Sequence, residues 1–372
     1  MDNNTRWSNG SELKSVLDSV TVPTEILNKI NENRQFNKVI IKYYEKLLHE
    51  TGLDILISKM RNMQLCNAFY EVDVYREQKI KDFKRTNNCK DKHCSNCKKV
   101  VQAARMAKYI PELEKYKAHL YHMTLTQVNC TGDKLEKKLK KMSRKFKMLI
   151  EYLSGREKIK GIDFTGWEYQ GAIRSLEITF RRDSYHPHYH IAIVFEGELG
   201  HKYNVNKYSY SNRSNKIRYF SDAEILIQKI WYLLMNDKTV TKEAISSLKD
   251  GYSCVIDKFK SSDYVEIFKY ISKVSDEENK TLTYNNFKIL HFALHFMKQI
   301  QGYGCFYKIK NNLSEKDINE ADQLYNDLIV YLQSKESPIY QVDRLEDLIK
   351  DSQYTLISRK RIYKYLVGAL SE

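Results

Sequence analysis

The sequence predicts an α+β fold, in which strands and helices are mixed along the chain. Short runs that alternate polar and apolar residues are typical of half-buried strands, and longer runs with apolar residues three and four apart are typical of helices. The two kinds of run do not follow one another in strict strand–helix–strand order, which argues against a parallel sheet. Two neighbouring strand-like runs, 172–180 and 188–195, are joined by a short turn-like segment and predict a hairpin.

The first half of the chain predicts a helical region, a strand and a basic helix. Residues 22–63 carry apolar side chains at helical spacing, and residues 120–128 alternate as a half-buried strand does. In 135–153 the apolar residues form one helical stripe and lysines crowd the remaining surface. Such a surface is typical either of a solvated helix face or of a helix that contacts phosphates.

The second half adds one well-marked helix after the hairpin. It begins at Ser221, where Glu224 three residues later completes a capping box. The other elements that we expect there are a strand over 252–259 and helices over 263–274, 284–300 and 318–332, the last behind a box of Ser314 and Asp317.

Composition and charge limit the class of protein. The 372 residues are 42% hydrophobic and 12% aromatic, which excludes wholesale disorder. The 62 lysines and arginines exceed the 47 acidic residues by 15, which favours a polyanionic partner such as nucleic acid over a merely basic housekeeping enzyme. No apolar run approaches the 18 or so residues of a membrane span, and the N-terminal segment lacks the order of a secretory signal. We therefore expect a soluble, cytoplasmic protein that has no membrane partner.

Four of the seven cysteines are clustered within 32 residues of sequence. They are Cys66, Cys89, Cys94 and Cys97. In a reducing compartment such a cluster favours a metal site over disulfides. Two alternatives are free buried cysteines and a site in which His93 replaces Cys66.

The hairpin is the most informative segment, because its second strand carries His188 and His190. Residues two apart in a strand share a face, so both imidazoles project to one side. If Asp183 and Ser184 centre the turn, Glu177 lies opposite His190, about 5 Å away. One divalent ion could then bind all three side chains. A hydrogen-bonded pair of surface histidines beside an incidental glutamate is the alternative, and the same ligand set also describes a non-haem iron oxygenase.

Residues 262–273 predict a helix with two stripes. A carboxylate, a phenol and an ammonium form a polar line that suits phosphoryl transfer, although an exposed helix face explains the spacing as well. The polar line is Glu266, Tyr270 and Lys273, and the apolar stripe is Tyr264, Ile267, Phe268 and Ile271.

Three segments occur in a telling order: His-Met-Thr-Leu-Thr at 122–126, Leu-Glu-Ile-Thr followed by Tyr-His-Pro-His-Tyr-His within 176–190, and Glu-x3-Tyr-x2-Lys at 266–273. Together they resemble the rolling-circle plasmid replication initiators of the HUH endonuclease superfamily, and most closely the helicase-less type with one catalytic tyrosine. Gly-Tyr-Gly-Cys-Phe at 302–306 corresponds to that family's glycine near the domain end. The cysteine cluster resembles its C…CxxRxCPxC element, with Lys92 and Ser95 in place of the usual arginine and proline.

This resemblance implies an HUH fold, an antiparallel sheet of about five strands with flanking helices. It further implies a division into an N-terminal helical region (1–62), a zinc-binding module (63–112), an HUH catalytic domain (113–310) and a C-terminal helical extension (311–372).

The resemblance also implies the chemistry. Glu177, His188 and His190 would hold Mg²⁺ or Mn²⁺, and Tyr270 would attack the scissile phosphate to form a 5′-phosphotyrosyl link and a free 3′-hydroxyl. Lys273 would stabilise the phenolate or a phosphate oxygen, and Glu266 would activate water in the second step. The four clustered cysteines would bind structural Zn²⁺. The expected partners are double-stranded origin DNA, single-stranded hairpin DNA and, because no Walker sequence is present, a host helicase.

Two other functions stay open at this point. One is a transposase or relaxase of the same superfamily, although relaxases usually place the tyrosine before the histidines. The other is a non-catalytic, sequence-specific DNA-binding protein whose histidines are structural.

Overall fold

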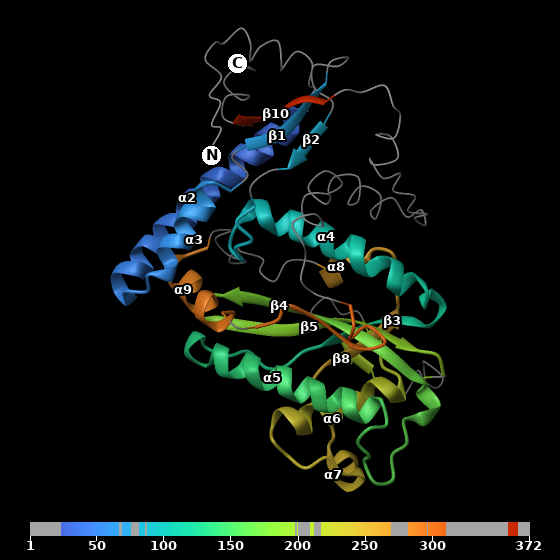
Figure 1. Ribbon diagram of the computed structural model, residues 1–372. Coiled ribbons are helices and arrows are strands. Elements are labelled where there is room, and N and C mark those ends of the chain that lie inside the picture. The colour runs from blue at the N-terminus through green and yellow to red at the C-terminus, as the bar shows by residue number, and fades with distance from the viewer. Residues whose placement is uncertain are drawn as a thin grey trace. The chain divides into compact units, whose positions relative to one another are not determined.

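The computed structural model describes residues 24–66, 69–75, 82–85, 88–197, 199, 209–211, 217–268, 282–295, 297–309 and 356–363 (Figure 1). These residues fall into two compact units that divide between Ala104 and Arg105, inside helix α4 (Ser95–Glu114). The expected division into four parts stays a prediction. None of the described helices is long and apolar enough to cross a membrane. The helix expected over 318–332, with its capping box, lies outside the described residues.

The first unit begins with two helices, α2 (Thr24–Thr51) and α3 (Ile55–Gln64). A single helical region was expected here, but the chain turns between them at Gly52, whose φ of +68° is a conformation that favours glycine. The two helices pack on each other through buried apolar side chains, among them Tyr44, Leu47, Leu56 and Met63.

A three-stranded antiparallel sheet belongs to the same unit. It has the order β10-β1-β2 and consists of β1 (Phe69–Tyr75), β2 (Asp82–Arg85) and β10 (Leu356–Tyr363). β10 lies within the segment expected to be a C-terminal helical extension (311–372), but Leu356–Tyr363 is a strand that pairs along the whole of β1.

The second unit is built on a five-stranded antiparallel sheet of order β8-β3-β5-β4-β9, and the predicted α+β fold with flanking helices is confirmed. Its strands are β3 (Leu120–Leu125), β4 (Tyr169–Arg181), β5 (Ser184–Phe195), β8 (Cys254–Lys258) and β9 (Ile300–Gly304). β9 replaces the end of the helix that was expected to reach residue 300. A Cβ at Gly302 would lie 2.2 Å from the Phe306 carbonyl oxygen, so the glycine permits the close chain approach after this edge strand.

Helices cover both faces of this sheet, with α5 and α6 on one side and α4 and α8 on the other (Figure 1). The apolar stripe of α5 (Gly132–Leu153) is fully buried, as predicted, and its Phe146 packs on Tyr189 of β5 at 5.3 Å between ring centroids. α8 (Asp263–Phe268) packs against β4 and β5. The smaller elements are α7 (Lys242–Ser247), α9 (Tyr284–Ala293), the hairpin β6 (Ser209–Ser211) with β7 (Ile217–Tyr219), and two 3₁₀ turns at 117–119 and 165–167.

The capping box predicted for α6 (Asp222–Met235) is present. The Ser221 hydroxyl accepts a hydrogen bond from the Glu224 backbone N–H, and the Glu224 carboxylate accepts one from the Ser221 N–H. Glu224 is buried because its other oxygen also accepts the Ile256 N–H of β8, 2.8 Å away. The cap therefore fixes both the start of α6 and its position on the sheet edge.

The register of the β4–β5 hairpin differs from the expected one by two residues. Arg181 pairs with Ser184, so Arg182 and Asp183 form the turn and Glu177 lies opposite His188 instead of His190. Arg182 has the left-handed φ of +54°, and the Asp183 carboxylate accepts the Gly132 N–H at 3.1 Å, which holds the turn at this position. A shift of two residues keeps every side chain on its predicted face.

Candidate metal centres

Three side chains of the hairpin converge on the sheet face that α8 covers. The Glu177 Oε2 atom is 3.2 Å from His188 Nε2 and 2.9 Å from His190 Nε2. The three ligand atoms all lie within 4.8 Å of one another. Their side chains are between 9% and 13% exposed, so the group is shielded from bulk water and still reachable from one side.

Both histidines are held from behind by hydrogen bonds to their second ring nitrogen. His188 Nδ1 lies 3.3 Å from the His186 carbonyl oxygen, and His190 Nδ1 lies 3.2 Å from His122 Nε2. His122 Nδ1 in turn lies 3.1 Å from Asp263 Oδ1 at the start of α8. When both Nε2 atoms face a cation, each Nδ1 carries its hydrogen. The His188 N–H then donates to the His186 carbonyl oxygen, and the His190 N–H donates to His122 Nε2, whose own Nδ1–H donates to Asp263. The arrangement therefore suits two metal-binding imidazoles.

Asp263 is suited to the far end of that chain. Burial alone would raise the pKa of its carboxyl group, but the hydrogen bonds from His122 and from the Lys260 backbone N–H lower the pKa below its usual value. Asp263 is thus a carboxylate at neutral pH and accepts a hydrogen bond from the His122 Nδ1–H. It also ties α8 to β3, which carries His122.

The Glu/His group fits a divalent cation. Neighbouring ligands of an octahedral ion bound at about 2.1 Å stand about 3 Å apart. The Glu177 oxygen lies at that separation from both imidazole nitrogens. One carboxylate and two imidazoles leave open positions for the oxygens of a substrate.

The first part of the predicted tyrosine helix lies on the same sheet face. Tyr264, Ile267 and Phe268 are buried, as the apolar stripe predicted, and Phe268 stacks on Tyr109 of α4 with 5.5 Å between ring centroids. Glu266 lies within α8 and is half-buried. Ile271 and two of the three polar-line residues, Tyr270 and Lys273, follow the end of α8 and lie outside the described residues.

The second group consists of the four clustered cysteines, whose sulfur atoms all lie within 4.8 Å of one another. Cys66 Sγ is 3.4 Å from Cys97 Sγ and 3.5 Å from Cys94 Sγ, and Cys89 Sγ is 3.6 Å from Cys97 Sγ. A disulfide would require about 2.05 Å. Thiolates around a tetrahedral Zn²⁺ at about 2.3 Å stand roughly 3.8 Å apart, so the group fits zinc. Cys66 completes the set, and His93 is not part of it.

Hydrogen bonds and charge prepare these thiols for a cation. The Asn37 amide donates to Cys94 Sγ at 3.2 Å, and the Lys90 backbone N–H donates to Cys97 Sγ at 3.3 Å. Hydrogen bonds from the other three thiols lower the pKa of Cys94 well below its usual value, and the same contacts raise the pKa of Cys89. The negative charge on one sulfur thus disfavours ionisation of the neighbouring thiols, and a bound cation would offset the added charge and allow all four to ionise.

The loop of the cysteine group is fixed to the helices of its unit by Asp91. Its buried carboxylate accepts hydrogen bonds from the Tyr44 hydroxyl at 2.9 Å and from Lys59 Nζ at 3.2 Å. Burial would raise the pKa of Asp91, but the charges of His93 and Lys59 lower it. The loop that carries Cys89 and Cys94 is therefore fastened to α2 and α3.

Residues 80–342 match the family model Rep_1, described as a replication protein, and this match covers more than two thirds of the chain. The chain belongs to this family. The predicted resemblance to the rolling-circle replication initiators of plasmids is thereby confirmed. No curated protein and no solved structure matches the chain.

The part of this Rep_1 protein that matches the family includes the Glu/His group, α8 and three of the four clustered cysteines, while Cys66 precedes it. His122 lies in a segment whose sequence resembles the family, but the sequence alone gave neither His122 nor Asp263 a role at the metal ligands. The alternation of the predicted strand placed His122 on a definite face, but its partner is 141 residues away and no local pattern connects them.

Proposed function

We propose that this replication initiator is an HUH endonuclease that nicks one strand of the plasmid origin and rejoins it at termination. The observation that carries the proposal is the convergence of Glu177, His188 and His190 on the face over which α8 lies. α8 ends at Phe268, two residues before Tyr270. A nucleophile that follows α8 so closely in sequence supports the proposal, because the start of α8 is bonded through Asp263 and His122 to the Glu/His group.

Glu177, His188 and His190 would hold the catalytic Mg²⁺ or Mn²⁺. Such an ion, when bound, polarises the scissile phosphate and offsets charge on its oxygens. The protein's own contribution is orientation, because His122 and Asp263 hold the His190 ring in one position and one tautomer.

Tyr270 is the proposed nucleophile. Its hydroxyl oxygen forms a bond to phosphorus, and the bond from phosphorus to the 3′ oxygen breaks, which leaves a 5′-phosphotyrosyl link and a 3′-hydroxyl that primes synthesis. A tyrosine has a pKa near 10, so the phenolate needs a nearby cation, a role that suits Lys273. Glu266 would accept a proton from water in the second, terminating cleavage.

The cysteine group has a different role in this proposal. Zn²⁺ bound by Cys66, Cys89, Cys94 and Cys97 would organise a segment with little core of its own, on which we expect contacts with the origin duplex. Unwinding would come from a host helicase. The match to a family of replication proteins supports this assignment over a transposase or relaxase.

A covalent-adduct assay tests the proposal. Protein is incubated with Mn²⁺ and a labelled single-stranded hairpin from the DNA that flanks its coding region, and the products are separated on a denaturing gel. We expect an adduct from the wild type and none from Tyr270→Phe. Tyr307→Phe, which alters a tyrosine that is 73% exposed and outside the site, is the matched control and retains the adduct.

Each other outcome has a definite meaning. Equal adduct from Tyr270→Phe and the wild type would assign the nucleophile to another residue. Complete absence of adduct from the wild type, with hairpin binding retained, would contradict the nicking chemistry and leave a non-catalytic origin-binding protein.

A further inference from the structure

The metal-ligand face of the hairpin continues beyond the metal ligands toward the turn. Glu177 pairs with His188, the next pair on the same face is Thr179 with His186, and the last is Arg181 with Ser184. Each step of two residues advances about 7 Å along the strands. A chain of phosphates that enters at the metal ligands therefore meets these polar pairs in succession.

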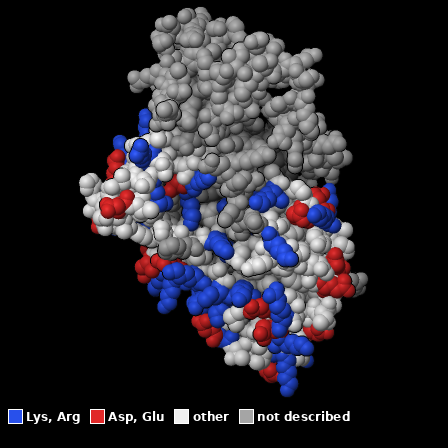
Figure 2. Space-filling model, in the orientation of Figure 1, with Lys and Arg blue, Asp and Glu red and all other residues white. Residues whose placement is uncertain are grey.

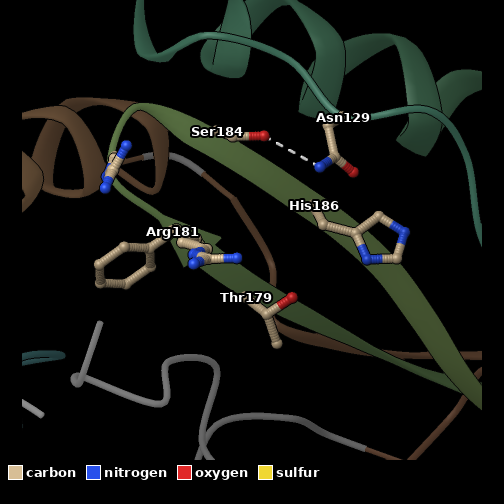
Figure 3. A pocket seen from close by; sticks show the side chains of 7 residues that line it. Asn129, Thr179, Arg181, Ser184 and His186 are labelled. Atoms are coloured by element: carbon tan, nitrogen blue, oxygen red, sulfur yellow. Dashed lines mark hydrogen bonds between the residues drawn. The ribbon is translucent and has the colours of Figure 1, made fainter. Parts of the chain in front are cut away.

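The two pairs nearer the turn, Thr179 with His186 and Arg181 with Ser184, line a pocket of about 560 Å³ at the hairpin tip. Figure 3 shows Thr179, Arg181 and His186 around the same space, with the Asn129–Ser184 hydrogen bond at one side. None of the described residues that line it is acidic. Arginine forks, imidazole, hydroxyl and amide groups together form a surface that favours a phosphodiester.

The walls of the pocket are held in place before any ligand binds. The loop between β3 and α5 is bonded to β5 through the backbones of Cys130 and Tyr185, at 2.9 and 2.8 Å. The Tyr185 side chain is buried, and its hydroxyl donates to Asn286 Oδ1 of α9 at 2.5 Å. Gly132 allows the loop to approach closely, since a Cβ there would lie 2.4 Å from Ile289 Cδ1. Binding at the tip thus requires little ordering of the backbone.

Positive charge continues from this pocket onto α5. A neighbouring pocket of about 670 Å³ shares Asn129 and Ser184 with the first and is lined by four lysines of α5. Figure 2 shows lysines and arginines gathered over this part of the molecule. The lining lysines are Lys134, Lys137, Lys138 and Lys141.

We infer that the hairpin-tip pocket, through Arg181 and Arg182, is a phosphate subsite for the single-stranded DNA on one side of the scissile phosphate. The inference rests on the proposed function, because it names the path of the substrate strand away from that site. Arg181 and Arg182 are both exposed and carry the charge that would neutralise the strand.

Binding measured without chemistry tests the subsite. Full-length Tyr270→Phe protein, with no Mg²⁺ or Mn²⁺ added and no chelator that would remove zinc, is titrated into a fluorescent 20-nucleotide oligothymidine over a range of salt concentrations. Adding Arg181→Ala and Arg182→Ala should weaken binding about 10-fold to 100-fold. The slope of log affinity against log salt should also become shallower by roughly 1.4, because two single-strand phosphate contacts are lost.

The matched control removes two exposed positive charges elsewhere, with Arg156→Ala and Lys158→Ala, and should leave the salt slope unchanged. Equal slopes for the tip variant and this control would overturn the subsite, provided that both give the parental thermal transition. Arg181→Lys with Arg182→Lys should restore the slope and only part of the affinity, because lysine keeps the charge without the planar fork.

The two proposals fail separately. If the tip variant loses affinity but wild-type protein forms no covalent adduct, the subsite stands and the nicking chemistry falls. If the adduct forms and the tip variant binds as the control does, only the subsite falls.

Discussion

The two groups of metal-ligand residues, one in each compact unit, are built in opposite ways. The cysteine group is closed, because Cys66, Cys94 and Cys97 are at most 2% exposed, and backbone N–H groups donate to the sulfurs of Cys66 and Cys97. The Glu/His group is more open, because its three side chains are between 9% and 13% exposed. Four thiolates fill a tetrahedral site and leave no position for a substrate, whereas three ligands leave at least one position open.

The secondary structure that carries the ligands also differs between the two groups. Cys89 lies in a loop without regular structure and Cys94 immediately precedes α4, so the metal itself must supply much of the local order. Glu177 and His188 belong to the two longest strands of a packed five-stranded sheet, whose order comes from strand pairing and a buried core. We therefore expect that loss of metal unfolds the unit that carries the cysteine group. In the unit that carries the Glu/His group, loss of metal should leave the sheet folded and abolish only the proposed activity.

Removal of one thiol should have the largest effect. Cys94→Ser takes away the sulfur to which Asn37 donates and leaves three ligands, so we expect zinc content to fall from about one per chain toward zero. The free energy of unfolding of the first unit should fall by several kcal/mol. Zinc binding contributes roughly 10 kcal/mol to the folding of small zinc domains, and the variant would lose part of such a contribution. Elemental analysis and thermal unfolding measure the two effects.

Cys305→Ser is the matched control, because Cys305 is exposed and outside the cluster. It should retain zinc and the unfolding transition. His190→Ala should also retain the unfolding transition of the sheet. If Cys94→Ser retained all of its zinc, the cysteine group would not be a closed site of four thiolates.

Local chemistry made part of the fold predictable. The Ser221–Glu224 cap, the buried stripe of α5 and the faces of the hairpin strands all follow from spacing within a few residues. The same holds for the assignment of Glu177, His188 and His190 to one face, which the structure brings together as expected. Periodicity carries this information because each periodic set buries or exposes one face.

Contacts between distant segments could not be obtained in this way. β1 pairs with β10 almost 300 residues later, and nothing in Leu356–Tyr363 alone favours that partner. The hairpin register was wrong by two residues because Asp183 is bound by Gly132, from a loop some 50 residues earlier. His122 and Asp263 were missed for the same reason, since they meet only once β3 and α8 are packed.

The open site should show a smaller, graded response to changes behind its ligands. Asp263→Ala removes the acceptor of the His122 N–H, so the His190 ring loses its fixed tautomer and orientation. We expect Mn²⁺ affinity to fall 10-fold to 100-fold, as for other outer-shell partners of metal ligands. Electron paramagnetic resonance of free and bound Mn²⁺ measures this affinity directly.

Asp237→Ala is the matched control for that change. Asp237 is an exposed carboxylate whose partner Lys145 lies 2.9 Å away on α5, remote from the Glu/His group. Its loss should leave Mn²⁺ affinity as it was. A purely structural role for Asp263 would lower the unfolding temperature without altering Mn²⁺ affinity, and that result would remove His122 and Asp263 from the metal centre.

Replacement of one ligand type by another should have the smallest effect. Cys66→His keeps four ligands in a combination that zinc accepts, so we expect about one zinc per chain and an unfolding temperature only slightly lower. In Co²⁺-substituted protein, the sulfur-to-metal charge-transfer absorption should fall by about a quarter, because three thiolates remain of four. Unchanged absorption would mean that Cys66 Sγ is not a ligand, and His93 would return as the candidate for the fourth position. Since Cys66 precedes the part of the chain that matches the family, this variant also tests whether the closed site extends beyond it.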